Sequence, residues 1–196
     1  MNQQFIYIVR HALVEYTGNS SKDRVISLST LGGQQALDLA SKLLSIPTPV
    51  EAIYSSDLPR AIETIRPFAE SKNMTIHQDS GFAEHNYAGN TKKFHEESIQ
   101  NRNFKFPGGE SLEQSSRRFS DAIEKVVLTG AHTIIVSTHG SIFADFLIRR
   151  FNVDMNFYFQ ISCPDVYVLK YEDDLLKEYR RCSELLPFST TIPIHS

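Results

Sequence analysis

The stretch "FIYIVRHALVEY" at residues 5–16 decides the fold, because a short apolar run within it ends abruptly in two polar side chains. The run Ile6–Val9 is typical of a buried strand, and Arg10 and His11 follow it directly. A strand that stops at two cation-capable groups indicates an anion at that point. The alternative is that Arg10 extends to water and His11 lies on the surface, since polar residues commonly end strands. This stretch alone leaves both interpretations open.

The composition is that of an ordinary globular protein. The chain has 196 residues, of which 41% are hydrophobic and 22% charged, and its net charge is -3. We expect a single domain over residues 1–196, with no basic footprint for nucleic acid. No apolar run approaches the roughly 20 residues that span a bilayer, and residues 1–4 lack the pattern of a signal peptide, so we expect none. The two cysteines, Cys163 and Cys182, make no disulfide framework, so we expect a cytoplasmic protein.

Strand-like and helix-like patterns alternate along the chain, which is typical of an α/β fold with a largely parallel sheet. We therefore expect a three-layer sandwich in which helices cover both faces of a central, mostly parallel sheet. Ser29 or Thr30 caps the first helix, Asp57 stands at an N-cap position before Pro59, and Pro67 predicts a kink or an end of that second helix. The expected strands lie at residues 5–9, 52–54, 74–77, 133–136, 166–170 and 175–179.

Between Gly81 and Gly109 the periodicity fails, and a polar and aromatic stretch replaces it. A structureless loop of this length is uncommon in a compact domain and is often a functional lid. We expect an excursion over the surface at about residues 81–109, with glycines that favour an open, mobile rim. Regular structure returns at Ser111 and Gln114, which have the spacing of a capping box at a helix start.

Polar residues follow three strand ends in the same way. His11 follows the first strand, His139 follows the strand at 133–136, and Arg60 falls in the first turn of the helix after the second strand. Ligands of open α/β sheets bind beyond the carboxyl ends of the strands, and a helix N-terminus favours anions. Arg10, Arg60, His11 and His139 together predict a pocket for a dianion, although each of them alone fits a solvated surface.

Several short motifs in order extend this pattern. They are "RHA" (10–12), "SLSTLGGQQA" (27–36), "YSSDLPRAIET" (54–64), "AEH" (83–85), "PGGES" (107–111) and "VSTHG" (136–140). In this order they resemble the histidine phosphatase superfamily, in the branch related to cofactor-dependent phosphoglycerate mutase. The resemblance covers residues 5 to about 150. It implies a metal-independent phosphomonoester hydrolase that uses no cofactor and acts on a small phosphorylated metabolite.

The resemblance also implies how the phosphoryl group is held. His11 would attack phosphorus and carry the phosphoryl group as phosphohistidine. Arg10, Arg60 and His139 would bind the phosphoryl oxygens, with Gly140 beside them, and would neutralise charge in the transition state. The flanking cations disfavour protonation of His11 and keep a lone pair available for attack. Because the protein supplies the positive charge, no metal is expected.

A carboxyl group is needed to protonate the leaving alkoxide, and Glu84 in the "AEH" motif is the candidate. It would later deprotonate the water that hydrolyses the phosphohistidine. Glu15 and Glu110 are the competing carboxylates, and the bland alternative for Glu84 is a solvated loop residue.

The sequence departs from the family pattern at two places. Ala12 replaces the usual glycine after the first histidine, and it adds a methyl group close to the pocket. Thr17 stands where the family often has an asparagine that helps to hold phosphate, so either Asn19 reaches in from two positions further on or the contact is absent. Among the remaining histidines, His85 and His95 are candidates for contact with the substrate.

Two other functions fit the same motifs. The first is phosphoryl transfer of the phosphoglycerate mutase type, in which the phosphohistidine passes its group back to a bound acceptor. The second is a non-catalytic module that binds a phosphorylated ligand. The intact set of His11, Arg10, Arg60, Glu84 and His139 argues against the second, and specificity for the substrate is expected to lie in residues 81–109.

Overall fold

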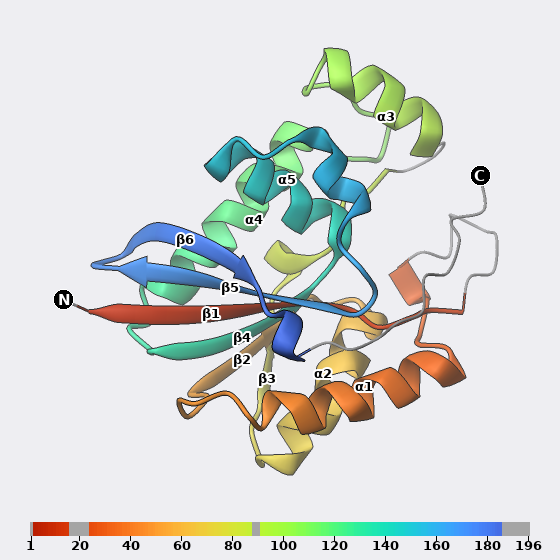
Figure 1. Cartoon of the computed structure of the whole chain (residues 1–196). Helices are drawn as coiled ribbons and strands as arrows, with labels where there is room; N and C mark the ends of the chain where they lie inside the picture. Colours follow the sequence, from red (N-terminus) through yellow and green to blue (C-terminus); the bar gives the residue numbers. More distant parts are fainter. Residues whose placement is uncertain (1, 16–23, 88–90, 186–196) are drawn as a thin grey trace.

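The computed structural model describes residues 2–15, 24–87 and 91–185, where a central sheet lies between two layers of helices (Figure 1). Helices α1 and α2 cover one face of the sheet, and α4 and α5 cover the other. This arrangement confirms the three-layer α/β sandwich expected from the sequence. The strands are β1 (Gln3–Arg10), β2 (Ala52–Ser55), β3 (Ile76–Gln78), β4 (Thr133–Thr138), β5 (Asp165–Glu172) and β6 (Leu175–Arg181). The α-helices are α1 (Thr30–Leu43), α2 (Pro59–Ser71), α3 (Thr91–Gln100), α4 (Leu112–Val127) and α5 (Gly140–Phe151), and short 3-10 helices lie at Ser80–Phe82, Met155–Phe159 and Ser183–Leu185.

The six strands have the order β3-β2-β4-β1-β5-β6. Strands β1 to β4 pair in parallel, whereas β5 pairs antiparallel with β1 and forms an antiparallel hairpin with β6. Arg10 at the end of β1 lies opposite Thr138 of β4 on one side and opposite Asp165 of β5 on the other. The carboxyl ends of β1 and β4 therefore meet at one edge of the sheet, as the strand-end pattern predicts.

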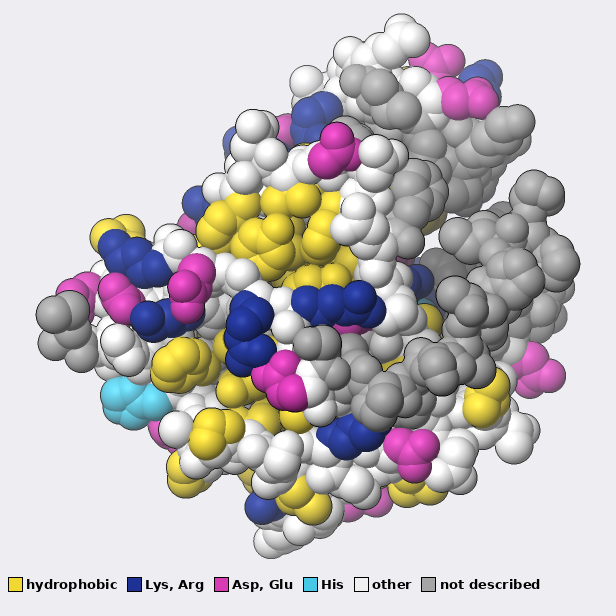
Figure 2. All heavy atoms as spheres, viewed as in Figure 1, with side chains coloured by type: hydrophobic (Ala, Val, Ile, Leu, Met, Phe, Trp, Pro, Cys, Tyr) yellow, Lys and Arg dark blue, Asp and Glu magenta, His cyan; other side chains and the backbone are white. Residues whose placement is uncertain are grey.

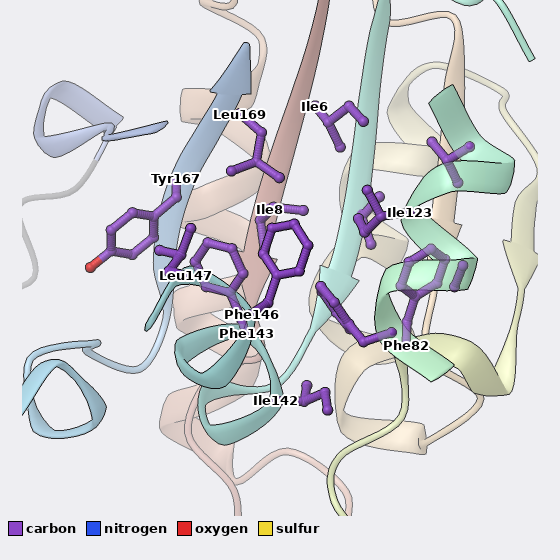
Figure 3. Close-up of a cluster of buried hydrophobic side chains, with 14 of the residues drawn as sticks. Ile6, Ile8, Phe82, Ile123, Ile142, Phe143, Phe146, Leu147, Tyr167 and Leu169 are labelled. Atoms are coloured by element: carbon purple, nitrogen blue, oxygen red, sulfur yellow. The ribbon is translucent and has the colours of Figure 1, made fainter. Parts of the chain in front are cut away.

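Strand β1 supplies both hydrophobic cores, because its side chains alternate between the two faces of the sheet. Ile6 and Ile8 pack into the core beneath α4 and α5, and Tyr7 and Val9 pack into the core beneath α1 and α2. Figure 3 shows Ile8 against the ring of Phe146 from α5. A strand buried on both faces reads as a continuous apolar run, which explains the sequence pattern.

Local signals at the helix ends are confirmed at two helices. The Ser29 hydroxyl caps α1 by accepting a hydrogen bond from the Gly32 N–H, and Ser111 with Gln114 forms the predicted capping box of α4. Gly32 is required for another reason: a Cβ there would lie 1.9 Å from the Leu13 carbonyl oxygen. Helix α1 thereby packs directly on the backbone that follows the site strand.

Three predicted boundaries around α2 are wrong. The N-cap of α2 is Leu58 rather than Asp57, whose carboxylate pairs with Arg24 at 3.0 Å instead. The helix does not end at Pro67 but continues to Ser71, since the loss of one hydrogen bond is offset by the burial of its apolar face. The Met74 N–H closes the end of α2 on the Ala69 carbonyl, and β3 therefore begins at Ile76 rather than at residue 74. The corrected N-cap lies two residues before Arg60, so it sets where Arg60 stands in the first turn of α2.

The excursion at residues 81–109 is not structureless, which corrects the expectation of an open rim. It contains α3, and its described part is anchored to the body of the domain. The Arg102 guanidinium donates to both carboxylate oxygens of the buried Asp145 at 3.0 and 2.9 Å, and the Tyr158 hydroxyl donates to the same carboxylate at 3.0 Å. The Phe94 ring of α3 packs on the His85 ring, with ring centroids 4.5 Å apart. These contacts hold α3 against the body of the domain.

Charged side chains of both signs are interspersed on the face that carries β5 and β6 (Figure 2). Arg180 and Glu184 form one such exposed pair, with 2.6 Å between Nη1 and Oε1. Within the described part of the chain, no helix has both the length and the apolar character needed to cross a membrane.

Candidate active site

His11 lies directly after β1, and its backbone N–H donates to the Thr138 carbonyl of β4 at 3.0 Å. Its ring is buried, and Nδ1 is 2.8 Å from the Ala12 carbonyl oxygen. Because a carbonyl oxygen only accepts hydrogen bonds, Nδ1 carries the proton and Nε2 keeps its lone pair. Burial, Arg60 and Arg10, in that order, lower the pKa of His11 to about 3. The ring is therefore neutral at physiological pH, with Nε2 as a nucleophilic atom.

His139 follows β4 and meets His11 at the same edge of the sheet. The two ring centroids are 5.1 Å apart, and the His139 ring is fully buried. Its Nε2 lies 2.8 Å from the Ser56 hydroxyl oxygen, which fixes the ring from the end of β2. Burial, followed by His11 and the nearby arginines, lowers the pKa of His139 well below its usual value. The Nδ1 atom is buried and has no hydrogen-bond partner among the described residues, so it is available to bind a ligand.

Arg10 lies between the end of β1 and the start of α5. Its Nη1 donates to the Ile161 carbonyl and, at 3.3 Å, to the Ser162 carbonyl. Its Nε is buried without a partner in the described structure. A Cβ on Gly140 would lie 2.8 Å from this Nε and 2.9 Å from Cζ, so the glycine lets the guanidinium lie against the first residue of α5.

Arg60 is the second residue of α2, and its side chain is buried. Its charge lowers the pKa of both His11 and His139, so it acts on the same pocket. Thr64 joins this helix to the nucleophile strand: its hydroxyl donates to the Arg60 carbonyl at 2.7 Å and accepts from the Ala12 N–H at 2.9 Å. The threonine of the "RAIET" motif thus fixes the backbone on both sides of the pocket.

Glu84 lies at the N-terminus of α5, next to His139. Its Oε2 accepts from the Ser141 N–H at 3.2 Å, and its Oε1 accepts from the Ile142 N–H at 3.0 Å. A carboxylate suits a helix N-terminus, where unpaired N–H groups and the helix dipole favour negative charge. Oε1 also accepts from the His85 N–H at 2.9 Å, whereas Oε2 accepts a single hydrogen bond and keeps a lone pair that can exchange a proton with a group in the pocket.

The two competing carboxylates are placed differently. Glu110 is held by Arg118, with 2.6 Å between Oε1 and Nη2, and Glu15 is exposed. Among the three, the structure places only Glu84 against the N-terminus of the helix that follows His139.

The sequence of the chain matches one known family. The model of the histidine phosphatase superfamily (branch 1) matches residues 6–180. The chain belongs to the histidine phosphatase superfamily. This confirms the resemblance and the expectation of an enzyme of the histidine phosphatase type.

Several solved structures share the fold of this chain. The native mycobacterial glucosyl-3-phosphoglycerate phosphatase has a TM-score of 0.69 at 17% identity, covering 92% of this chain and 97% of its own. A putative alpha-ribazole-5'-P phosphatase from Escherichia coli has a TM-score of 0.70 at 14% identity, covering 91% and 95%. A phosphoglycerate mutase from Bacillus anthracis has a TM-score of 0.71 at 19% identity, covering 90% and 91%. A search of curated protein sequences found no match.

The histidine phosphatase site includes one residue that the sequence motifs did not indicate. Arg118 of α4 donates from Nη1 to the carbonyls of Ser80, Gly81 and Ala83, at 2.7, 2.9 and 3.1 Å. It thereby fixes the segment that ends in Glu84. The only available signal was a charged residue bordering the apolar face of an amphipathic helix, which by itself indicates nothing about a site.

Of the other predicted site residues, Ala12 and His85 are described by the structure, and the rest are not. Ala12 is fully buried in the position of the family glycine, and the structure accommodates its methyl group. His85 is buried, with its Nδ1 2.9 Å from the Ser115 hydroxyl and its ring packed on Phe94, so it supports α3. Thr17 and Asn19, and the side chain of His95, lie outside the described residues. Among the described residues, no group of three or more His, Cys, Asp or Glu side chains is arranged to hold a metal ion.

Proposed function

We propose that this protein hydrolyses a phosphomonoester of a small metabolite through a phosphohistidine on His11, without a metal. The observation that carries the proposal is the hydrogen bond from His11 Nδ1 to the Ala12 carbonyl, 2.8 Å long. It leaves Nε2 with a lone pair in a pocket that holds two guanidinium groups. A neutral imidazole beside fixed positive charge is suited to attack on a phosphorus atom.

The first half-reaction transfers the phosphoryl group to the enzyme. Nε2 of His11 forms a bond to phosphorus while the bond from phosphorus to the substrate oxygen breaks. Arg10, Arg60 and His139 Nδ1 bind the phosphoryl oxygens and stabilise the charge that spreads over them. Glu84 passes a proton to the leaving oxygen, and the dephosphorylated alcohol departs.

The second half-reaction releases inorganic phosphate. Water attacks phosphorus, Glu84 removes its proton, and the bond between Nε2 and phosphorus breaks. The proton that Glu84 gave to the alcohol is thereby recovered, so each cycle consumes one monoester and one water. The free thiols of Cys163 and Cys182 fit a protein of a reducing compartment such as the cytoplasm.

A second candidate is phosphoryl transfer of the mutase type, and the anchoring of the segment that contains α3 bears on the choice. A mutase must keep water from its phosphohistidine until the acceptor takes the group. Nη2 of Arg102 donates to both carboxylate oxygens of Asp145 and holds the segment after α3 to the body of the domain. An open, mobile rim would favour a phosphatase, because water would reach the phosphohistidine; the ordered α3 removes that argument, and the two reactions need a direct test.

The test supplies monoesters from a metabolite panel and measures inorganic phosphate. 3-Phosphoglycerate is included with and without 2,3-bisphosphoglycerate, and both phosphoglycerate isomers are followed. A phosphatase releases phosphate steadily from at least one monoester, with isomerisation slower by orders of magnitude. Rapid isomerisation that depends on the bisphosphate, with little free phosphate, would establish the mutase instead.

A further inference from the structure

The turn at residues 161–165 contacts two residues of the candidate site, although none of the sequence motifs includes it. Its Ile161 and Ser162 carbonyls accept the hydrogen bonds from Arg10 Nη1. Its Cys163 thiol donates to the His11 carbonyl, with 2.8 Å between sulfur and oxygen. One short turn therefore contacts both the nucleophile and the arginine beside it.

Asp165 holds this turn in place from a fully buried position. Its Oδ2 accepts from the Ser162 N–H at 2.8 Å, and its Oδ1 accepts from the Val166 N–H at 3.0 Å. Arg181 of β6 completes the set, with its Nε 2.9 Å from Oδ1 and its Nη2 2.8 Å from Oδ2. The forked guanidinium and the carboxylate thus form a bidentate pair.

Arg10 and Asp165 are directly opposite each other in the antiparallel pair of β1 and β5. Side chains of directly opposite residues leave the sheet on the same face, with Cβ atoms about 4.5–5.5 Å apart. Arg10 nevertheless bonds to neutral carbonyls, and no described carboxylate forms an ion pair with it. The buried carboxylate opposite it, Asp165, pairs with Arg181 instead, so the charge of Arg10 is not neutralised by Asp165.

We propose that Arg181 is a positioning residue: by neutralising Asp165, it keeps the Arg10 guanidinium on the carbonyls of the turn and available to the phosphoryl group. This inference rests on the proposed function. Without Arg181, the buried carboxylate has no counter-charge, and Arg10 is the cation that lies opposite it. Arg10 then turns towards Asp165 and away from the phosphoryl oxygens. If the ion pair of Arg181 and Asp165 only stabilised the hairpin of β5 and β6, its loss would not move Arg10.

The inference is tested by a cycle of Arg181→Gln, Asp165→Asn and the double variant, measured as kcat/KM on p-nitrophenyl phosphate. We expect Arg181→Gln to lose about 100-fold, the loss that a misplacement of about 1 Å produces in an active site. The double variant should recover at least about 10-fold of it, because the carboxylate that attracts Arg10 is gone. Arg180→Gln is the matched control, since it removes the exposed neighbour on the same strand and should leave kcat/KM unchanged.

Inhibition by orthovanadate gives a second measurement, and it should weaken in parallel with kcat/KM in Arg181→Gln. If that variant does not fold, Arg181→Lys replaces it, because lysine keeps the charge without the fork and should retain most of the activity. Equal losses in Arg181→Gln and the double variant, or wild-type activity in Arg181→Gln, would overturn the inference. If the wild type hydrolyses no monoester, the proposed function fails, and calorimetric binding of orthovanadate to the same variants still tests the role of Arg181.

Discussion

Gly140→Ala should reduce activity without unfolding the protein, because the added methyl group meets Arg10. The new Cβ would lie 2.8 Å from Nε and 2.9 Å from Cζ, whereas ordinary contacts begin at 3.4 Å. The difference, 3.4 − 2.8 = 0.6 Å, is the distance by which the guanidinium must retreat. Since a misplacement of about 1 Å costs about 100-fold in rate, we expect kcat/KM to fall between about 10- and 100-fold.

The stability of the same variant should change little. Gly140 is the first residue of α5, where alanine is preferred to glycine by up to about 1 kcal/mol, and the side chain that must move is flexible. The assay is hydrolysis of p-nitrophenyl phosphate beside a thermal melt. Gly33→Ala in α1 is the matched control, because its Cβ would meet nothing within 4 Å, and it should leave kcat/KM unchanged. Wild-type kcat/KM in Gly140→Ala would refute the placement of Arg10 as a phosphate ligand.

Three further predictions test the acid, the metal and the pH dependence. Glu84→Gln should cut hydrolysis of alkyl phosphates by about 100-fold or more but affect p-nitrophenyl phosphate less, since that leaving group departs without a proton; equal losses would mean that Glu84 only caps α5. Activity should survive EDTA, because Arg10 and Arg60 supply the charge, and recovery only on adding magnesium or manganese would contradict this. Burial and the two arginines lower the pKa of His11 from 6.5 to about 3, so the unfolded chain binds the proton first as the pH falls. Chemical denaturation at pH 8 and pH 5 should therefore show a loss of stability on acidification that is about 2 kcal/mol larger in the wild type than in His11→Asn, and equal losses would exclude the lowered pKa.

The convergence of the site was predictable because it follows from sheet geometry. Parallel neighbouring strands end at one edge, so the residues after β1 and β4 had to meet, and the rings of His11 and His139 are 5.1 Å apart. The capping box of α4 was predictable for a similar reason, since its signal lies within four residues. Both depend on short-range pattern and on a topology that alternates strands with helices.

The supports of the site were not predictable, because their partners lie far away in sequence. Arg118 fixes the Glu84 segment from α4, and Arg181 pairs with Asp165 across a hairpin. In a sequence, such residues look the same as solvated charges on an exposed face. The helix α3 was missed because its residues are mostly polar and it lacks a strong apolar stripe, so contacts such as that of Phe94 with His85 decide its position.

The most direct test of the central claim is the identity of the atom that carries the phosphoryl group. Enzyme quenched within one turnover of a monoester should carry an acid-labile phosphate on His11, detected by mass spectrometry and by ³¹P NMR. Because Nδ1 donates to the Ala12 carbonyl, the phosphate should be bonded to Nε2, and His11→Ala should carry none. Phosphate on Nδ1, on a serine, or on any residue of His11→Ala would contradict the account.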